Sequence, residues 1–405
     1  MSNNGSINGE RPISELRFPE FEGLPIHAVR LGDVTEEPSL RNHGHLPPEF
    51  VMGVRKDDGI VPMEDRLVAS DTTRYKIVRN NWFAYNPMRL NIGSIARWQG
   101  EEDVLVSPDY VVFRCLEQTK PTRLLPSYLD QFRRAKQWDS FVNGSGDGGV
   151  RVRIYYRDLA RLQLLLPDVP EQEKVAACLS TLDGLIEAEA DKLSALEQWK
   201  LGLAQQLFPV PGEKKPRQRF PAFQGATEWK EATLRDLCRM KAGKFVAAAE
   251  ISEDPKDDLH PCYGGNGLRG YTSTFTHSGS YILIGRQGAL CGNVNLVTGK
   301  FHATEHAIVT APRKGVVLSW LYHALEHLKL NDFATGQAQP GLSVERLEKI
   351  SCPVPQDEQE QRLIADSLSS IMRQISLHST RLEQLRVHKN GLMQKIFPST
   401  KKAGK

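Results

Sequence analysis

Apolar residues alternate at spacings of four and three positions in two stretches of the chain, residues 171–209 and 360–398. This period is typical of a long helix that buries one narrow stripe against a partner helix. The two stretches align without a gap at an offset of 189 residues, so they predict two spacer helices packed on each other as an antiparallel coiled coil. The predicted seam consists of Val175, Leu179, Leu182, Ile186, Leu193, Leu196, Leu203 and Leu207 in the first helix and of Ile364, Leu368, Ile371, Ile375, Leu382, Leu385, Leu392 and Ile396 in the second.

The repeat extends beyond these helices. The motif RFPEFEG at residues 17–23 recurs as RFPAFQG at residues 219–225, and a long mixed region follows each copy. A repeat of this size indicates two domains, since solenoid repeats span about 20–50 residues. The chain is therefore predicted to be a duplicated unit with pseudo-twofold symmetry.

The two mixed regions resemble each other more faintly. Residues 281–294 can be placed on residues 82–95, and residues 303–309 on residues 106–112. Short β-prone runs mixed with a few helical segments predict one diverged α+β fold for both regions. The predicted boundaries are a flexible tail at 1–15, domain 1 at 16–168, a spacer helix at 169–210, domain 2 at 211–353, a second spacer helix at 354–398 and a basic tail at 399–405.

Composition narrows the class of protein. No apolar run approaches the roughly 20 residues that cross a bilayer, and residues 1–15 lack the apolar core of a signal peptide. The six cysteines form no CxxC pair, which favours small apolar fillers in a reducing compartment over disulfides or zinc ligation. The composition predicts a soluble, cytoplasmic protein with no membrane contact.

Positive charge gathers in the mixed regions and not in the spacer helices. Residues 66–97 carry six basic residues and one acid, and residues 259–304 carry three basic residues and no acid, whereas residues 171–209 carry seven acids and three bases. Arg and Lys neutralise phosphates, and Arg, Asn and Gln read base edges. The predicted DNA contacts are Arg74, Lys76, Arg79, Asn80, Arg89 and Asn91 in domain 1 and Tyr263, Asn266, Arg269, Tyr271, Arg286 and Gln287 in domain 2.

Three motifs resemble catalytic or cofactor signatures. Residues 302–306 and 323–327 both match HxxEH, a zinc-peptidase pattern that needs a helix and a third ligand. The first match precedes a strand-like run, and no third ligand can be nominated for the second. Residues 265–270 match GxGxxG, but no helix follows as a dinucleotide site requires. We expect no catalytic residue, no bound metal and no cofactor on this chain.

The chain resembles a specificity subunit of a type I restriction-modification system over nearly its whole length. The shared features are the RFPEFEG-type opening of each half, the EQ that begins each spacer helix and its LFP or IFP ending. The mixed regions then correspond to two target recognition domains. Residues 263–271 and 284–288 of the second, and residues 86–93 and 106–110 of the first, are similar to segments of such domains. The stretch entering the second helix, residues 353–360, is shifted in register relative to residues 167–171.

This resemblance implies a non-catalytic subunit that reads double-stranded DNA, with a bipartite target that is asymmetric because the two domains differ in sequence. It also implies two modification (methyltransferase) subunits and ATP-dependent restriction subunits as partners. S-adenosylmethionine, ATP and Mg²⁺ would be bound by those partners only. The alternative is a coiled-coil adaptor that binds proteins and has no DNA specificity; a peptidase is a more distant third.

Overall fold

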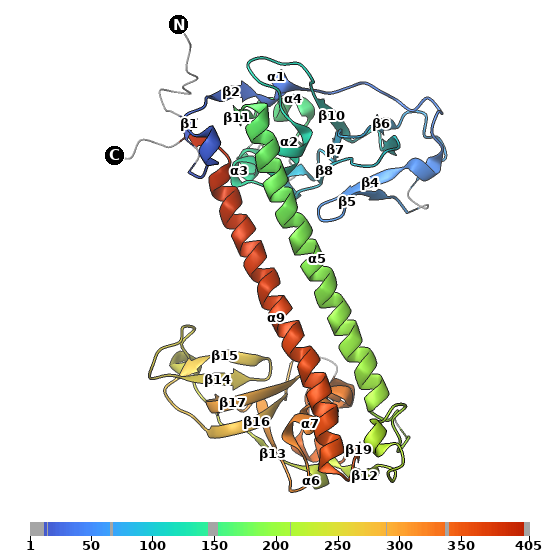
Figure 1. Cartoon of the computed structure of the whole chain (residues 1–405), viewed down its shortest axis with the longest axis vertical. Coiled ribbons are helices and arrows are strands. Elements are labelled where there is room, and N and C mark those ends of the chain that lie inside the picture. Colours follow the sequence, from blue (N-terminus) through green and yellow to red (C-terminus); the bar gives the residue numbers. More distant parts are fainter. Residues whose placement is uncertain are drawn as a thin grey trace. The chain divides into compact units, whose positions relative to one another are not determined.

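The chain folds as two compact units, and each contains one α+β domain together with parts of two long helices (Figure 1). The computed structural model describes residues 12–13, 15–64, 68–144, 153–210, 212–288, 290–336 and 340–400. The first unit comprises Met1–Glu189 and Arg381–Lys405, and the second comprises Ala190–Thr380. Within the described ranges, no helix combines the length and apolarity that a membrane span requires.

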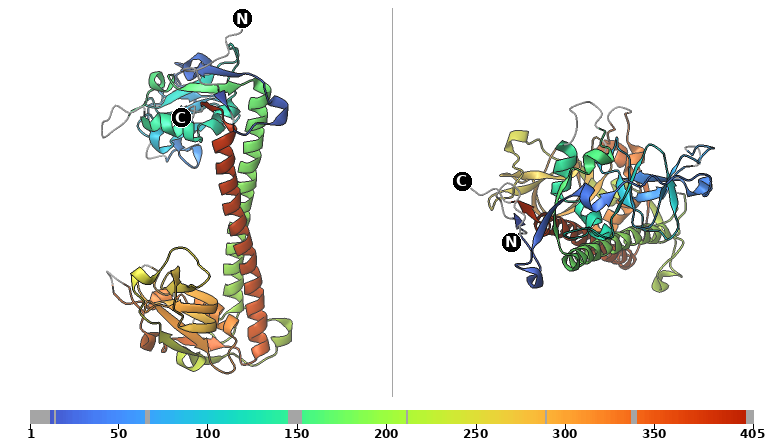
Figure 2. Two further views of the ribbon diagram at one scale, coloured as in Figure 1. Left: turned by 90° about the vertical axis from the view of Figure 1, so that its left-hand side faces the viewer. Right: turned by 90° about the horizontal axis from the view of Figure 1, so that it is seen from above.

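The two long helices are α5 (Val169–Leu207) and α9 (Glu358–Ile396), each of 39 residues. In the first unit the start of α5 packs against the end of α9, so that Val175 and Leu179 share a core with Ile396. In the second unit the end of α5 packs against the start of α9 around Leu207 and Ile364. The helices are thus antiparallel and lie side by side within each unit (Figure 2), as predicted, and all sixteen seam positions are buried or half-buried.

Both helix bounds fall inside the predicted spacer segments 169–210 and 354–398. The division into two units, however, cuts through both helices. The helices therefore belong to the cores of the two units and do not form a body of their own.

Polar residues on the helix seam form ion pairs. In the first unit Lys389 pairs with Asp183, and Arg381 Nε lies 3.8 Å from Glu189 Oε2. In the second unit Lys200 Nζ lies 3.0 Å from Glu326 Oε1 in α7 (Leu318–His327). Lys200 and Lys389, which occupy the same place in the repeat, thus both have a carboxylate partner.

The Asp183 pair predicts a pH-dependent contribution to stability. Burial raises the pKa of Asp183, but hydrogen bonds from Lys389 and Gln131, together with the charges of Lys389 and Arg134, outweigh burial and hold that pKa below its usual 3.8. A carboxyl group whose pKa is lowered by folding stabilises the fold at every pH above its pKa in the unfolded chain. This contribution is lost as the pH falls through the pKa of the folded state. We expect Asp183→Asn to lower the free energy of unfolding at pH 7, and the deficit to shrink below about pH 4. Urea unfolding at pH 7 and pH 3 measures it, with the exposed Glu187→Gln as control; an equal deficit at both pH values would contradict the pairing.

The domain of the first unit is built from short strands. Its central sheet has the order β3 (Thr35–Glu36), β10 (Val111–Cys115), β7 (Phe83–Tyr85), β8 (Ile95–Arg97). Three strand pairs surround it: β2 (Ile26–Arg30) with β11 (Gln163–Pro167), β4 (Met52–Arg55) with β5 (Gly59–Pro62), and β6 (Lys76–Val78) with β9 (Val104–Val106). The helices are α1 (Leu31–Val34), α2 (Pro126–Phe132), α3 (Lys136–Gly144) and α4 (Tyr156–Leu159).

The domain of the second unit has one larger sheet. Its order is β13 (Cys238–Ala242), β18 (Ala307–Pro312), β16 (His277–Gly285), β17 (Val294–Ala303), β14 (His260–Gly264), β15 (Gly267–Thr272). A separate pair joins β12 (Lys230–Thr233) to β19 (Ser351–Val354). The helices of this domain are α6 (Leu234–Leu237), α7 and α8 (Val344–Leu347).

Strand register confirms that the two domains are copies of one fold. In the first, Tyr85 lies opposite Val111 and Ile95. In the second, Ile284 lies opposite Ile308 and Val294. These are the positions that the sequence places on one another, by laying residues 281–294 on 82–95 and 303–309 on 106–112. The faint sequence similarity therefore corresponds to equivalent hydrogen-bond ladders.

The repeated motifs attach each domain to the beginning of a long helix. Arg17 forms a bidentate pair with Glu171, with Nε–Oε1 at 2.8 Å and Nη2–Oε2 at 2.6 Å. Arg219 pairs with Glu360 in the same way, at 2.8 and 2.7 Å. The arginine of each RFP motif thus holds the glutamate of the EQ motif in the same half of the chain.

The glutamine of the EQ motif satisfies the backbone that precedes each helix. Gln172, fully buried, donates from Nε2 to the carbonyl oxygens of Arg123 and Pro167 and accepts a bond from the Leu125 N–H. Gln361 makes the same three kinds of contact at 2.7–3.0 Å. Gln361 donates to the Pro355 carbonyl, six residues earlier, whereas Gln172 donates to Pro167, five residues earlier. The segment before α9 therefore contains one extra residue, and the same contact forms despite it.

The ends of the chain pair with each other in the first unit. Pro12–Ile13 (β1) is antiparallel to Ser399–Thr400 (β20), and Leu16 N donates to Lys395 O at 3.1 Å. The rest of both predicted tails, within 1–15 and 399–405, lies outside the described residues apart from Glu15.

Candidate nucleic-acid interface

Two glycine-rich loops of the second unit lie directly against each other. One is the turn of the β14–β15 hairpin, and the other follows β16. A Cβ added to Gly285 would lie 2.4 Å from the Gly265 carbonyl oxygen, and one added to Gly265 would lie 3.0 Å from the His306 carbonyl oxygen. Only glycine permits this backbone approach. The GGNGLRG and IGRQG segments therefore form one surface, and the turn before β18, which contains His306, is part of it.

The predicted DNA contacts of this unit divide by burial. Asn266, Arg269 and Gln287 are exposed on the joined loops. Tyr263 is half-buried in a core cluster, its ring 5.9 Å from that of Phe301, and burial raises its pKa. Tyr263 therefore supports the loops more than it offers a contact.

Two more predicted contacts of this unit are held by backbone bonds. Arg286 is half-buried; its N–H donates to His306 O at 2.9 Å, and its carbonyl oxygen accepts from Leu342 N at 2.9 Å. Tyr271 is half-buried as well, and both of its backbone groups pair with Ser252 at 2.8 Å. The pKa of Glu345 is lowered mainly by hydrogen bonds with its own backbone N–H and the Ser343 side chain, and the charge of Arg286 acts in the same direction.

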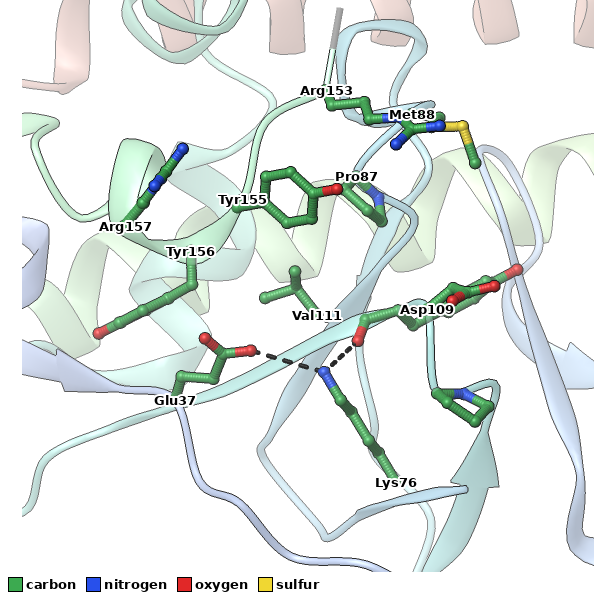
Figure 3. A pocket seen from close by; sticks show the side chains of 12 residues that line it. Glu37, Lys76, Pro87, Met88, Asp109, Val111, Arg153, Tyr155, Tyr156 and Arg157 are labelled. Atoms are coloured by element: carbon green, nitrogen blue, oxygen red, sulfur yellow. Dashed lines mark hydrogen bonds and ion pairs between the residues drawn. The ribbon is translucent and has the colours of Figure 1, made fainter. Parts of the chain in front are cut away.

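The equivalent loops of the first unit border a cavity of about 590 Å³ (Figure 3). Pro87 and Met88 follow β7, and Pro108, Asp109 and Tyr110 precede β10. These are the segments NPMR and SPDY, which had carried the resemblance in the first domain. The remaining lining residues are Glu37, Lys76, Val111, Arg153, Tyr155, Tyr156 and Arg157.

Lys76 is tied into this cavity and is not an isolated surface cation. Its Nζ donates to the Tyr110 carbonyl oxygen at 2.5 Å and lies 3.5 Å from Glu37 Oε1 (Figure 3). Burial lowers the pKa of Lys76, although the Glu37 carboxylate acts in the opposite direction. Two of its three ammonium protons thus have partners within the protein.

The other predicted contacts of the first unit do not join this cavity. Arg79 lies 5.8 Å from the Trp82 ring and its Nε is 3.3 Å from Asp103, while Asn80 donates to the Gly100 carbonyl at 3.0 Å. Arg74 is exposed just before β6. Arg89 and Asn91 are exposed after β7, and Asn91 borders a second cavity with Lys56, Arg133 and Arg134. Of the six residues predicted in this unit, only Lys76 lines the first cavity, and their DNA contacts stay predictions. Arg66, counted in the basic segment, lies outside the described residues.

Sequence reasoning missed several residues of this cavity. Glu37, Arg153 and Tyr155 come from segments far from residues 86–110, and no local pattern indicates that they meet there. Asp109 lies in the SPDY segment, residues 107–110. It was not selected because the sequence was searched for basic and amide side chains, and aspartate is an acid. The useful signal was the alignment of residues 303–309 on 106–112, which places Asp109 opposite His306 in the repeat.

The histidine motifs have other partners. His302 contacts Thr274 Oγ1 at 2.9 Å and the Lys244 carbonyl oxygen at 3.1 Å, while His306 Nδ1 lies 3.0 Å from Gln287 Oε1. In α7, His323 joins Glu326 and Ser369, which links this helix to α9. Among the residues described, no three His, Cys, Asp or Glu side chains gather as metal ligands would. Residues 265–270, the GxGxxG match, form the turn between β14 and β15 and the first part of β15, and not the start of a helix.

Comparison with known proteins gives a consistent class. The family model described as the type I restriction modification DNA specificity domain matches residues 226–387. The type I restriction enzyme EcoprrI specificity subunit of Escherichia coli is 40% identical over 155 residues, which are 37% of this chain and 39% of that protein. The MjaVIII specificity subunit of Methanocaldococcus jannaschii is 22% identical over 293 residues, 66% of this chain and 68% of the relative. The matched part of the chain thus spans about two fifths of the E. coli relative's length.

Solved structures share the fold. The S subunit of a type I restriction-modification system from M. genitalium superposes with a TM-score of 0.67 at 17% identity, over 96% of this chain and 100% of that one. A chain from a structural study of complex assembly and conformational transition in a type I R-M system has a TM-score of 0.52 at 18% identity, over 92% and 98%. The chain therefore shares the fold of these two solved structures. Residues 226–387 also match the specificity-domain family model.

Proposed function

We propose that this chain is the DNA-reading subunit of a type I restriction-modification complex and that it binds an asymmetric, bipartite duplex target. One observation carries the proposal. Equivalent strands of the two domains pair in the same register, but the loops next to these strands present different side chains. Asn266, Arg269 and Gln287 are exposed in one domain, and Met88 and Asp109 in the other. Two similar domains with different loops fit a target made of two unlike short words.

The chain itself performs no catalysis in this proposal. Two modification subunits would bind S-adenosylmethionine and methylate the target, and restriction subunits would use ATP and Mg²⁺ for cleavage. The complex would act in the cytoplasm, where the DNA lies. The E. coli and M. jannaschii relatives are named specificity subunits of type I restriction enzymes, which supports this assignment.

Sequencing of modified adenines in the source organism, with and without this gene, tests the proposal. We expect a split, asymmetric methylated motif that disappears with the gene. Selection from a randomised duplex library with the full-length chain gives a second test that does not need the partners. Salt-sensitive duplex binding separates a DNA reader from a coiled-coil adaptor, because counterion release accompanies phosphate contacts. If no methylated motif depended on the gene and the chain bound no duplex, the proposal would be overturned in favour of the adaptor.

One substitution tests which half-word the second unit reads. Arg286→Ala removes a guanidinium from the loop after β16 but keeps the backbone bonds of residue 286 to His306 and Leu342. We expect discrimination in one half-word to fall by about 5- to 100-fold, as for the loss of one arginine–guanine contact, while the other half-word stays intact. Duplex selection measures both half-words at once. Arg235→Ala, an exposed ion-pair residue on α6, is the control, and equal loss in both half-words would instead indicate misfolding.

A further inference from the structure

Asp109 and His306 occupy the same place in the two domains. Asp109 lies two residues before Val111, which pairs with Tyr85, and His306 lies two residues before Ile308, which pairs with Ile284. Both residues therefore stand in the turn that enters the central strand, next to the loop that leaves the neighbouring strand. One position of a shared scaffold thus carries an acid in one domain and an imidazole in the other.

Asp109 lies at the cavity of the first unit with its side chain exposed. The turn that holds it is fixed by a bond from Tyr110 N to Ser107 O at 3.0 Å. Within the described part of the chain its carboxylate accepts no hydrogen bond. Lys76 and Glu37, which pair with each other, line the cavity together with Arg153 and Arg157. The two arginines are the cations left to attract a DNA backbone, although Asp109 itself repels phosphate.

A carboxylate in a DNA interface has few suitable partners. It can only accept hydrogen bonds, and the donors in the major groove are the exocyclic amines, N4 of cytosine and N6 of adenine. The position of His306 offers different chemistry. Its Nδ1 lies 3.0 Å from Gln287 Oε1 and its Nε2 lies 3.2 Å from Glu305 Oε1, so both ring nitrogens have partners within the protein. The exposed Gln287 amide nitrogen is the donor that this position offers. Donors of this kind match acceptors such as O6 and N7 of guanine.

We propose that Asp109 determines specificity in the first half-word by accepting a hydrogen bond from the exocyclic amine of one cytosine or adenine. At the equivalent position the Gln287 amide nitrogen, beside His306, presents a donor in the second half-word. The inference rests on the proposed function, since it names the group that one domain reads. It also explains how equivalent turns on one scaffold can read unlike words.

Duplex selection with full-length Asp109→Ala protein tests this inference, because alanine has no acceptor, whereas the amide oxygen of an asparagine would still accept from the base amine. We expect the preference for cytosine or adenine at one base pair of one half-word to fall about tenfold, with the other half-word unchanged. Glu117→Ala is the matched control: it removes one exposed carboxylate just beyond the opposite end of β10 and should change neither half-word. Unchanged preference at every position in Asp109→Ala, or equal loss in both half-words, would overturn the assignment.

A base lacking the amine makes the test independent of folding. At the identified position, cytosine is replaced by pyrimidin-2-one, or adenine by purine. We expect this duplex to bind the wild-type protein about tenfold more weakly than the unmodified duplex. The Asp109→Ala protein should bind the two duplexes equally well. A wild-type protein indifferent to the missing amine would overturn the role of Asp109. If the wild-type chain selected no bipartite duplex at all, the proposed function would fall as well, so the two failures are distinguishable.

Discussion

Replacing Glu360 with alanine is expected to lower the free energy of unfolding by about 3–5 kcal/mol, the range found when one partner of a buried ion pair is removed. The Glu360 side chain is 2% exposed, and that of Arg219 is 9% exposed. The substitution leaves the Arg219 guanidinium without its bidentate partner and removes the acceptor of the Trp229 indole N–H, 3.3 Å away. Urea unfolding followed by tryptophan fluorescence is the measurement, because Trp229 is buried beside the pair.

Glu358 provides the matched control on the same turn of α9. It pairs with Arg362 at 2.9 Å, but both side chains are about half exposed. An exposed i,i+4 pair contributes only about 0.3–0.5 kcal/mol, so Glu358→Ala should be nearly neutral. Similar losses from the two substitutions would mean that helix propensity or charge, and not the Arg219 clamp, holds the domain to the helix.

The helices and the repeat were predictable because their signals are periodic or duplicated. A 3.5-residue apolar spacing requires only a partner stripe, and a second copy of the stripe supplied the partner. The roles of Arg17 and Glu171 were not predictable in the same way. They are 154 positions apart, and the sequence shows that both motifs recur but not that they touch.

The interface was harder to predict than the scaffold because charge along the chain does not reveal pairing in space. Lys76 was a reasonable phosphate contact by composition, yet Glu37 and the Tyr110 carbonyl oxygen engage its ammonium group. Conversely, Asp109 was passed over as an acid, although it is exposed at the cavity that Arg153 and Arg157 also line. Which charges remain available depends on tertiary contacts between loops that no local pattern encodes.

The repeat also separates what must stay constant from what can vary. The clamp residues Arg17 and Arg219, and the glutamines Gln172 and Gln361, make matching bonds in the two units. The loops above equivalent strands differ in sequence and in side-chain chemistry. A protein with this division can change one recognised word by changing one domain's loops, because the attachment of the domain to its helix does not involve them.

Gly285→Ala is expected to abolish recognition of one half-word while the other remains readable. The added methyl group would lie 2.4 Å from the Gly265 carbonyl oxygen and 2.7 Å from the Leu290 carbonyl oxygen. Both obstacles are backbone, so the hairpin turn and the loop after β16 must separate. Such overpacking costs about 1–3 kcal/mol of stability. Displacing the loops that carry Asn266, Arg269 and Gln287 should reduce discrimination about 10- to 100-fold at each base pair that they read.

Gly264→Ala is the control for this effect, since its added methyl group meets only the Thr304 hydroxyl at 3.7 Å and Arg269 Cδ at 3.9 Å. It changes the same hairpin without forcing the loops apart, and both half-words should survive. Duplex selection reports the two half-words from one library, and thermal unfolding shows that the Gly285→Ala protein remains folded. If Gly285→Ala left both half-words intact, the joined glycine loops would not be the reading surface. If both half-words were lost together, the damage would extend beyond the second unit.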